Sequence, residues 1–284
     1  MGDNKMLKSC YFTFGEAFSL RLTYAHFSSG NAMKTKSTLI ASSFLAIALP
    51  ALSFADSPFN GIQAGVTLGY EDASMDWDTD LVIDAFNPNN VAAPGANSSE
   101  SLDDSAFAYG VFGSYNMALS DSWILGAELA YQGSDISDSL NSIPGFFLSP
   151  SNQTKAEVEV NDTFLLGVKG GYLLNPTTLA YSTLSATLTE VEVSSNCPSD
   201  GAICNPGSPA RSDSDDDDIT GWALAVGVEK SLSSNLSVRA EYRYADLGTA
   251  EVSAVRQETG ESFGIDADVD VTSQTLQIGA AYKF

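Results

Sequence analysis

The chain ends with residues 276–284, LQIGAAYKF, in which two kinds of side chain alternate. Counting back from Phe284, every second residue is aromatic, aliphatic or small: Tyr282, Ala280, Ile278 and Leu276. The residues between them are polar or small. Successive side chains of a β-strand point to opposite faces of its sheet, so this spacing predicts a strand with one apolar face.

The strand ends on an aromatic residue at the carboxy-terminus, which points to a particular class of protein. The ending resembles the assembly signal of bacterial outer-membrane β-barrels, whose final strand and terminal Phe are read by the barrel-insertion machinery. The resemblance implies an assembly signal made of Leu276, Ile278, Ala280, Tyr282 and Phe284. The alternative is an ordinary edge strand of a soluble protein that ends on Phe.

The other end of the chain favours an exported protein. Met33 is followed by Lys34 and Lys36, by an apolar run over 39–52 and by a small-residue site before Asp56, which is the layout of a secretory signal peptide. The 14-residue run is shorter than the roughly 20 residues that a spanning helix needs. We therefore expect an over-extended gene start over 1–32, a signal peptide over 33–55 and one β-barrel domain over 56–284.

Without residues 1–55 the chain is more acidic. The full chain has 13 basic and 36 acidic residues; residues 1–55 hold five and two of these, which leaves 8 and 34 and a net charge of −26. Nucleic acid is excluded as a partner, because binding it needs clustered Lys and Arg. The single histidine, His26, is lost with the signal.

Two cysteines remain, Cys197 and Cys204, within the Pro/Gly/Ser-rich stretch NCPSDGAICNPGSP. An exported protein meets an oxidising compartment, so a disulfide that closes this short loop is favoured over two free thiols. Zinc is not expected without histidine or further cysteines.

Eight segments show the same alternation of an apolar face with a small or polar face. They cover 59–71, 105–117, 123–132, 158–173, 179–190, 219–230, 236–247 and 269–284. Each has at least the 9–11 residues that a tilted strand needs to cross a bilayer. The pattern is weakest in 179–190.

The connections between these segments alternate in length. Tight turns lie at 118–122, 174–178 and 231–235, whereas the connections near 72–104, 133–157, 191–218 and 248–268 are long. Outer-membrane barrels have short periplasmic turns and long external loops, so we expect both termini in the periplasm. Aromatic residues gather near both strand ends, as in two interfacial girdles.

A family resemblance supports this reading. The stretch from Gly221 to Gly248, GWALAVGVEKSLSSNLSVRAEYRYADLG, resembles the small outer-membrane β-barrel surface proteins related to the OmpA transmembrane domain. The opening from Phe59 to Tyr70 is similar to their first strand. The resemblance covers strands one and six to eight, while the middle strands fit by pattern alone. It implies a porin-like surface protein in the outer membrane of a Gram-negative cell.

Strand parity also places charged side chains inside the barrel. They are Glu128, Lys169, Glu229, Arg239, Glu241, Arg243 and Lys283. An eight-stranded barrel is just wide enough for side chains to fill, and buried charges must be paired. This predicts a salt-bridge plug, with a narrow gated ion path as the alternative. Glu128 and Lys169 stand at similar height on neighbouring strands, and we expect them to pair.

The predicted loops are acidic. Residues 71–104 hold nine acidic residues and no base, and a run of four aspartates spans 215–218. Such loops would attract divalent cations, which also bridge lipopolysaccharide phosphates. The alternative is a solvated acidic face, since no segment has the spacing of an EF-hand.

These features favour an all-β, eight-stranded antiparallel transmembrane β-barrel that displays acidic loops for surface interaction and envelope integrity. The alternative function is a small porin-like channel. No enzyme and no cofactor are expected, because the known outer-membrane enzymes of this size generally rely on a histidine. A soluble lipocalin-like barrel would need an apolar interior and a polar exterior. The expected partners are outer-membrane lipid, lipopolysaccharide and the insertion machinery.

Overall fold

A computed structural model of the chain describes residues 12–13, 19–20, 57–83, 91–92, 98–144, 154–198, 210–254 and 264–284. The chain divides into two units, Met1–Ala51 and Leu52–Phe284. In the first unit, β1 (Phe12–Thr13) pairs antiparallel with β2 (Ser19–Leu20). The predicted signal peptide and the start at Asp56 lie outside the described residues, so the processing scheme stays a prediction.

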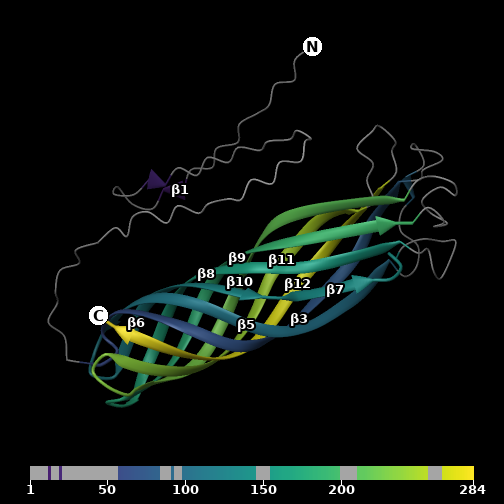
Figure 1. Ribbon diagram of the computed structural model, residues 1–284. Coiled ribbons are helices and arrows are strands. Elements are labelled where there is room, and N and C mark those ends of the chain that lie inside the picture. The colour runs from purple at the N-terminus through teal and green to yellow at the C-terminus, as the bar shows by residue number, and fades with distance from the viewer. Residues whose placement is uncertain are drawn as a thin grey trace, which may run out of the picture. The chain divides into compact units, whose positions relative to one another are not determined.

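The second unit is a closed antiparallel barrel (Figure 1). Its strands are β3 (Gly61–Ile83), β5 (Ser99–Ala118), β6 (Trp123–Ser134), β7 (Ile136–Leu140), β8 (Lys155–Asn175), β9 (Thr178–Cys197), β10 (Arg211–Ser231), β11 (Leu236–Ala254) and β12 (Gly264–Lys283). Consecutive strands pair along the chain, and β12 pairs with β3 to close the ring. A short strand, β4 (Val91–Ala92), adds two residue pairs to β3.

β6 and β7 occupy one position in the wall. β6 pairs with β8 as far as Gln132 opposite Thr163, and β7 resumes the same ladder with Ile136 opposite Val160. The wall therefore has eight strand positions, and the predicted eight-stranded antiparallel barrel is confirmed. Within the described residues, no helix is long and apolar enough to span a membrane.

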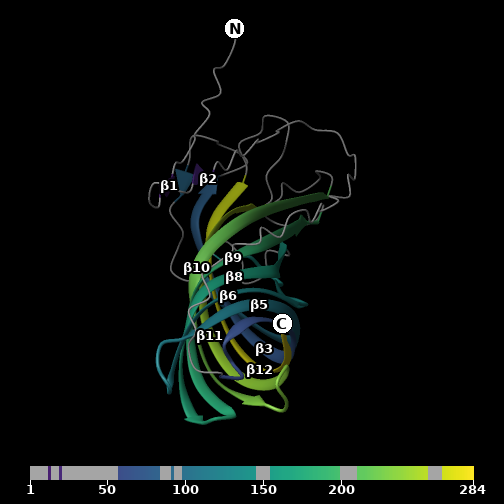
Figure 2. The ribbon, with the colours of Figure 1, turned by 90° about the vertical axis from the view of Figure 1, so that its left-hand side faces the viewer.

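One end of the barrel is tight. The links at 119–122, 176–177 and 232–235 lie where turns were predicted. Figures 1 and 2 show the carboxy-terminus at this same end. The backbone N–H of Phe284 donates to the carbonyl of Ile62 at 3.0 Å, which ties the end of the chain to the first strand of the barrel.

The predicted bounds of the long loops are wrong, because the strands continue into them. β3, β5 and β8–β12 are 19–23 residues long, about twice the length that crosses a bilayer. Parts of 72–104, 133–157, 191–218 and 248–268 are thus barrel wall. The barrel consequently has two halves: a half next to the turns, called the membrane half, and an outer half beyond it.

The membrane half is apolar outside. Its large outward side chains are exposed, including Ile62, Leu68, Phe107, Leu129, Leu166, Leu184, Val226, Leu276 and Ile278. This apolar band ends abruptly, since Tyr70 is followed outward by Asp72 and Phe164 is preceded by Asp162. The outward faces are thus the apolar faces of the eight predicted segments.

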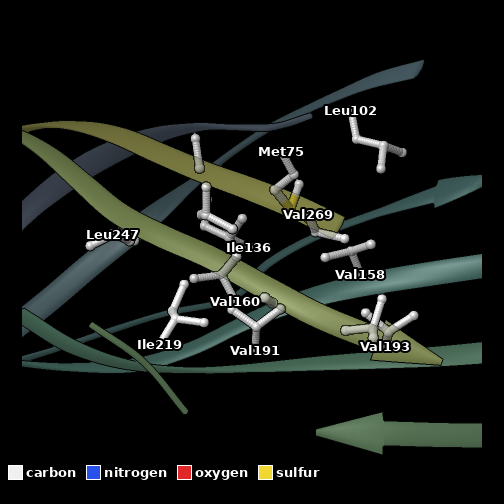
Figure 3. Close-up of a cluster of buried hydrophobic side chains, with 14 of the residues drawn as sticks. Met75, Leu102, Ile136, Val158, Val160, Val191, Val193, Ile219, Leu247 and Val269 are labelled. Atoms are coloured by element: carbon white, nitrogen blue, oxygen red, sulfur yellow. The ribbon is translucent and has the colours of Figure 1, made fainter. Parts of the chain in front are cut away.

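The outer half has the opposite polarity. Valine and other apolar side chains point inward from all eight wall positions and form one buried cluster (Figure 3). In β3, Met75 and Trp77 are inside, while Asp76 and Asp78 between them are exposed. Outside a bilayer the hydrophobic effect drives apolar side chains inward, because their burial removes them from water.

One seam interrupts the wall of the outer half. The ladder between β10 and β11 ends at Trp222 opposite Asp246. Beyond it, the carboxylates of Asp217 and Asp215 accept the backbone N–H groups of Glu251 and Ser253 at 3.3 and 2.9 Å. Side chains thus replace backbone acceptors along this edge of β11.

A β-bulge lies where the seam begins. The register of β11 against β12 shifts between Asp246 and Gly248, and Gly248 has φ +106°. Glycine adopts this left-handed conformation without steric cost. The extra residue changes the strand's parity, so Ala245 and Leu247 before the bulge and Val252 after it all face the interior.

Candidate functional site

The membrane half of the barrel encloses a layer of charged side chains. Lys169 on β8 forms an ion pair with Glu229 on β10, with Nζ and Oε2 2.9 Å apart. The hydroxyl of Ser237 donates to the other oxygen of Glu229 at 2.7 Å, and the amide of Gln63 donates to it at 3.3 Å. Lys169 Nζ also lies 4.1 Å from the ring centre of Tyr181.

A second ion pair crosses the lumen from β11 to β6. Arg239 Nη1 lies 2.9 Å from Glu128 Oε2. The guanidinium carbon of Arg239 lies 3.5 Å from the ring centre of Phe112 on β5, which covers one face of the cation. A guanidinium is planar and weakly hydrated, so it tolerates this combination of ion pair and ring contact.

The third pair lies along β11, and side chains of β6, β9 and β12 form hydrogen bonds with its two members. Arg243 Nη2 donates to Glu241 at 2.9 Å, and its Nη1 donates to Gln132 on β6 at 2.8 Å. The hydroxyl of Tyr181 on β9 and the amide of Gln277 on β12 donate to Glu241 at 2.8 and 2.6 Å. These hydrogen bonds compensate for taking the carboxylate out of water.

The predicted pairing of Lys169 with Glu128 is wrong. The two residues are diagonal neighbours, since Lys169 stands opposite Gly126 and Glu128 opposite Gly167. Each side chain instead reaches across the narrow lumen to a more distant strand. Lys283, also predicted in the network, lies near the tight end, where its Nζ donates to the carbonyl of Ser57 at 3.4 Å.

The structure adds residues that the sequence analysis missed. Glu71 is buried and accepts the amide of Gln132 at 3.0 Å, so the lumen layer holds four buried carboxylates and three buried cations. One interior cavity between Glu128, Thr183 and Arg243 measures about 10 Å³, about the space of one water molecule. Side chains therefore fill the lumen at this level.

The apolar cluster of the outer half stands directly above this layer. Trp77 is completely buried there, and its Nε1 donates to the hydroxyl of Thr79 at 2.9 Å. That hydroxyl donates to the carbonyl of Pro144 at 3.1 Å. This hydrogen bond joins the chain after β7 to β3, and Ile143 in the same segment is also buried.

The outer wall is acidic, but its acids lie on strands rather than loops. Outward carboxylates include Asp72, Asp76, Asp78, Asp103, Glu157, Glu159, Glu190, Glu192, Asp216, Asp218, Glu251, Asp268 and Asp270. Serine hydroxyls on β5 donate to several of them, as Ser105 does to Asp72 at 2.9 Å. In the described part of the chain, no three Asp, Glu, Cys or His side chains form a group that could hold a metal ion.

Partial burial and neighbouring acids raise the pKa of two carboxyl groups of the outer wall. Partial burial, followed by the charges of Asp218 and Asp216, raises the pKa of Glu190. Partial burial and the carboxylate of Asp80 raise the pKa of Asp268. In both cases the charged form is disfavoured, because like charges and lost hydration act in the same direction.

We therefore expect the outer half to become more stable as the pH falls through the range in which Glu190 and Asp268 take up protons. A carboxyl group whose folded-state pKa is raised binds more protons in the folded than in the unfolded state, so its contribution to stability decreases as the pH rises through that range. Hydrogen exchange of outer-half amides at neutral pH and within that range measures this, when each rate is divided into the intrinsic exchange rate at the same pH to give a protection factor. Glu190→Gln combined with Asp268→Asn should flatten the response, and smaller protection factors of wild type at the lower pH would contradict the prediction.

Two further predicted features lie at the ends of the barrel. Cys197 is buried and disulfide-bonded, while Cys204 lies outside the described residues, so the pairing of the two stays a prediction. On β12, Leu276, Ile278, Tyr282 and Phe284 are exposed on the outward face, and the rings of Tyr282 and Phe284 meet at 5.3 Å. Their role as an assembly signal stays a prediction.

An apolar belt around a closed barrel, short turns at one end and an interior of ion-paired charges define a transmembrane β-barrel of the outer membrane. Residues 38–284 match the family model described as outer membrane protein beta-barrel domain, and the chain belongs to that family. It is located in the outer membrane.

The chain is also similar to individual outer-membrane proteins. The chain is 28% identical over 188 residues to the 31 kDa outer-membrane immunogenic proteins of Brucella melitensis and Brucella suis, which covers 66% of this chain and 70% of each relative. Among solved structures, it is similar to the outer membrane protein OprG from Pseudomonas aeruginosa. The identity is 16%, the TM-score is 0.48, and the match covers 81% of this chain and 98% of OprG.

Proposed function

We propose that this protein is a closed surface-display barrel, which projects a rigid acidic wall from the outer membrane for surface interaction and envelope integrity. The observation that carries the proposal is the reversal of polarity between the two halves. The membrane half is closed by ion pairs, and the outer half above it is closed by a cluster of buried apolar side chains. Hydrated ions would have to cross both layers.

The size of the outer half supports display. β3 continues for thirteen residues beyond Tyr70, which at about 3.3 Å per residue and a tilt of about 40° projects about 30 Å from the bilayer. A wall of hydrogen-bonded strands holds its outward carboxylates in fixed positions. The Brucella relatives are named immunogenic, which fits residues presented at a cell surface.

The proposal assigns the barrel no enzymatic activity. The only histidine of the chain is His26, which precedes the barrel. The buried carboxylates of the lumen are held in ion pairs or accept hydrogen bonds from neighbouring side chains. They are therefore committed to holding the interior together.

Conductance in planar bilayers tests the proposal. Refolded protein, with residues 1–55 removed, should leave the bilayer electrically silent, whereas a porin refolded in the same way should give steady steps. Steady conductance by the wild-type protein would overturn the proposal and establish the porin-like channel. Heat-modifiable migration on gels would verify that the silent sample is folded.

A further inference from the structure

The lipid-facing wall of the membrane half is not evenly convex. A hollow of about 600 Å³ lies over β3, β12, β11 and β10. Ala280 stands opposite Val66 and Val238 in one row of the sheet, and Ala240 stands opposite Ile278 in the next row. Small residues between larger ones thus leave a depression that is almost wholly apolar.

A lysine lies at one end of the hollow. Lys230 lines it and lies next to the turn between β10 and β11. Its Nζ donates to the hydroxyls of Thr177 and Thr178 at 2.8 and 3.2 Å, which places the ammonium group at the level of the periplasmic turns. Among the side chains that the structure describes, it is the only cation on the lipid-facing wall.

The hollow runs obliquely from that edge into the bilayer. Lys230 is the last residue but one of β10, whereas Val66, in the same row of the sheet, is the sixth residue of β3. The row therefore climbs from the interface toward the hydrocarbon as it crosses four strands. A phospholipid of the periplasmic leaflet has the same layout, with its headgroup at the edge and its acyl chain pointing inward.

We propose that this hollow binds one anionic phospholipid of the periplasmic leaflet, with its acyl chain over Ala240 and Ala280 and its phosphate at Lys230. A long ammonium side chain at a membrane edge attracts anionic headgroups. A second copy of the barrel is a poorer occupant, because it would bury Lys230. The described lipid-facing wall offers no acidic side chain to neutralise it, and an unpaired buried charge is costly.

Native mass spectrometry of protein from vesicles of equimolar phosphatidylethanolamine and phosphatidylglycerol tests the proposal. The wild-type barrel should retain one phospholipid, predominantly phosphatidylglycerol. Lys230→Gln should lower this headgroup preference about five-fold, the effect of one lysine near an anionic surface. Ala240→Leu with Ala280→Leu should abolish retention of both lipids, because the new side chains fill the hollow.

Matched variants elsewhere separate this site from general lipid contact. Ala127→Leu on β6 and Ala186→Leu on β9 also face lipid, and Lys155→Gln removes an exposed cation of the outer half. All three should retain phosphatidylglycerol like wild type. The proposal is overturned if the wild-type barrel retains the two lipids in their input ratio, or if filling the hollow removes a dimer rather than a lipid.

Discussion

Replacing Lys169 by methionine should destabilise the barrel by about 3–5 kcal/mol, because it leaves Glu229 buried without its cation. The Glu229 carboxylate would keep only the hydrogen bonds from Ser237 and Gln63, which are neutral donors. Urea unfolding of the barrel in detergent or lipid, followed by tryptophan fluorescence, measures the loss. Lys155→Met is the control, since exposed substitutions usually change stability by less than about 0.5 kcal/mol.

A second substitution identifies the partner of Lys169. Glu229→Gln added to Lys169→Met should restore part of the stability, because it removes the orphaned charge. Glu128→Gln added to Lys169→Met should instead cost more, because it also breaks the pair with Arg239. Recovery by Glu128→Gln and not by Glu229→Gln would show that the lumen is paired through the neighbouring strand, contrary to the structure.

Trp77→Ala should be among the most damaging single changes in the outer half, at about 3–5 kcal/mol. The indole is fully buried and donates a hydrogen bond to Thr79, so truncation opens a large cavity and removes this hydrogen bond. The loss should be local. Hydrogen exchange and limited proteolysis should show opening of the outer half while the membrane half keeps its protection.

Trp222→Ala is the matched control, because it removes the same side chain from the outward face. Trp222 is 44% exposed and packs against Tyr244 at the edge of the apolar belt. Trp222→Ala should therefore lower the free energy of unfolding clearly less than Trp77→Ala does, and outer-half amides should stay protected. Equal effects of the two substitutions would mean that the outer half lacks a packed apolar core.

The strand alternation of the membrane half could be predicted from the sequence because a bilayer imposes one rule on every outward position. Lipid accepts only apolar side chains, so residues such as Ile62, Leu68 and Ile278 recur at every second position regardless of their neighbours. The terminal strand and the short turns follow from the same local pattern. The same alternation predicts that four charged side chains face the lumen: Glu128, Lys169, Glu229 and Arg239.

The sequence of the outer half also carries a local pattern of strands. Asp and Glu alternate there with Val, Met and Trp, as in Met75-Asp76-Trp77-Asp78 and in the run 190–193, EVEV. This is the same period of two with its polarity reversed. The acidic composition suggested solvated loops, whereas the alternation indicated strands with an apolar inward face.

The class of fold, the strand positions of the membrane half and the inward charges can all be predicted from spacing along one strand. The pairing of these charges depends on the closed ring, because the partners of Lys169 and Arg239 lie 60 and 111 residues away along the chain and are selected by the width of the ring. The lipid-facing hollow likewise depends on how four strands align. Ala240 and Ala280 form a depression only because larger side chains of neighbouring strands stand opposite them.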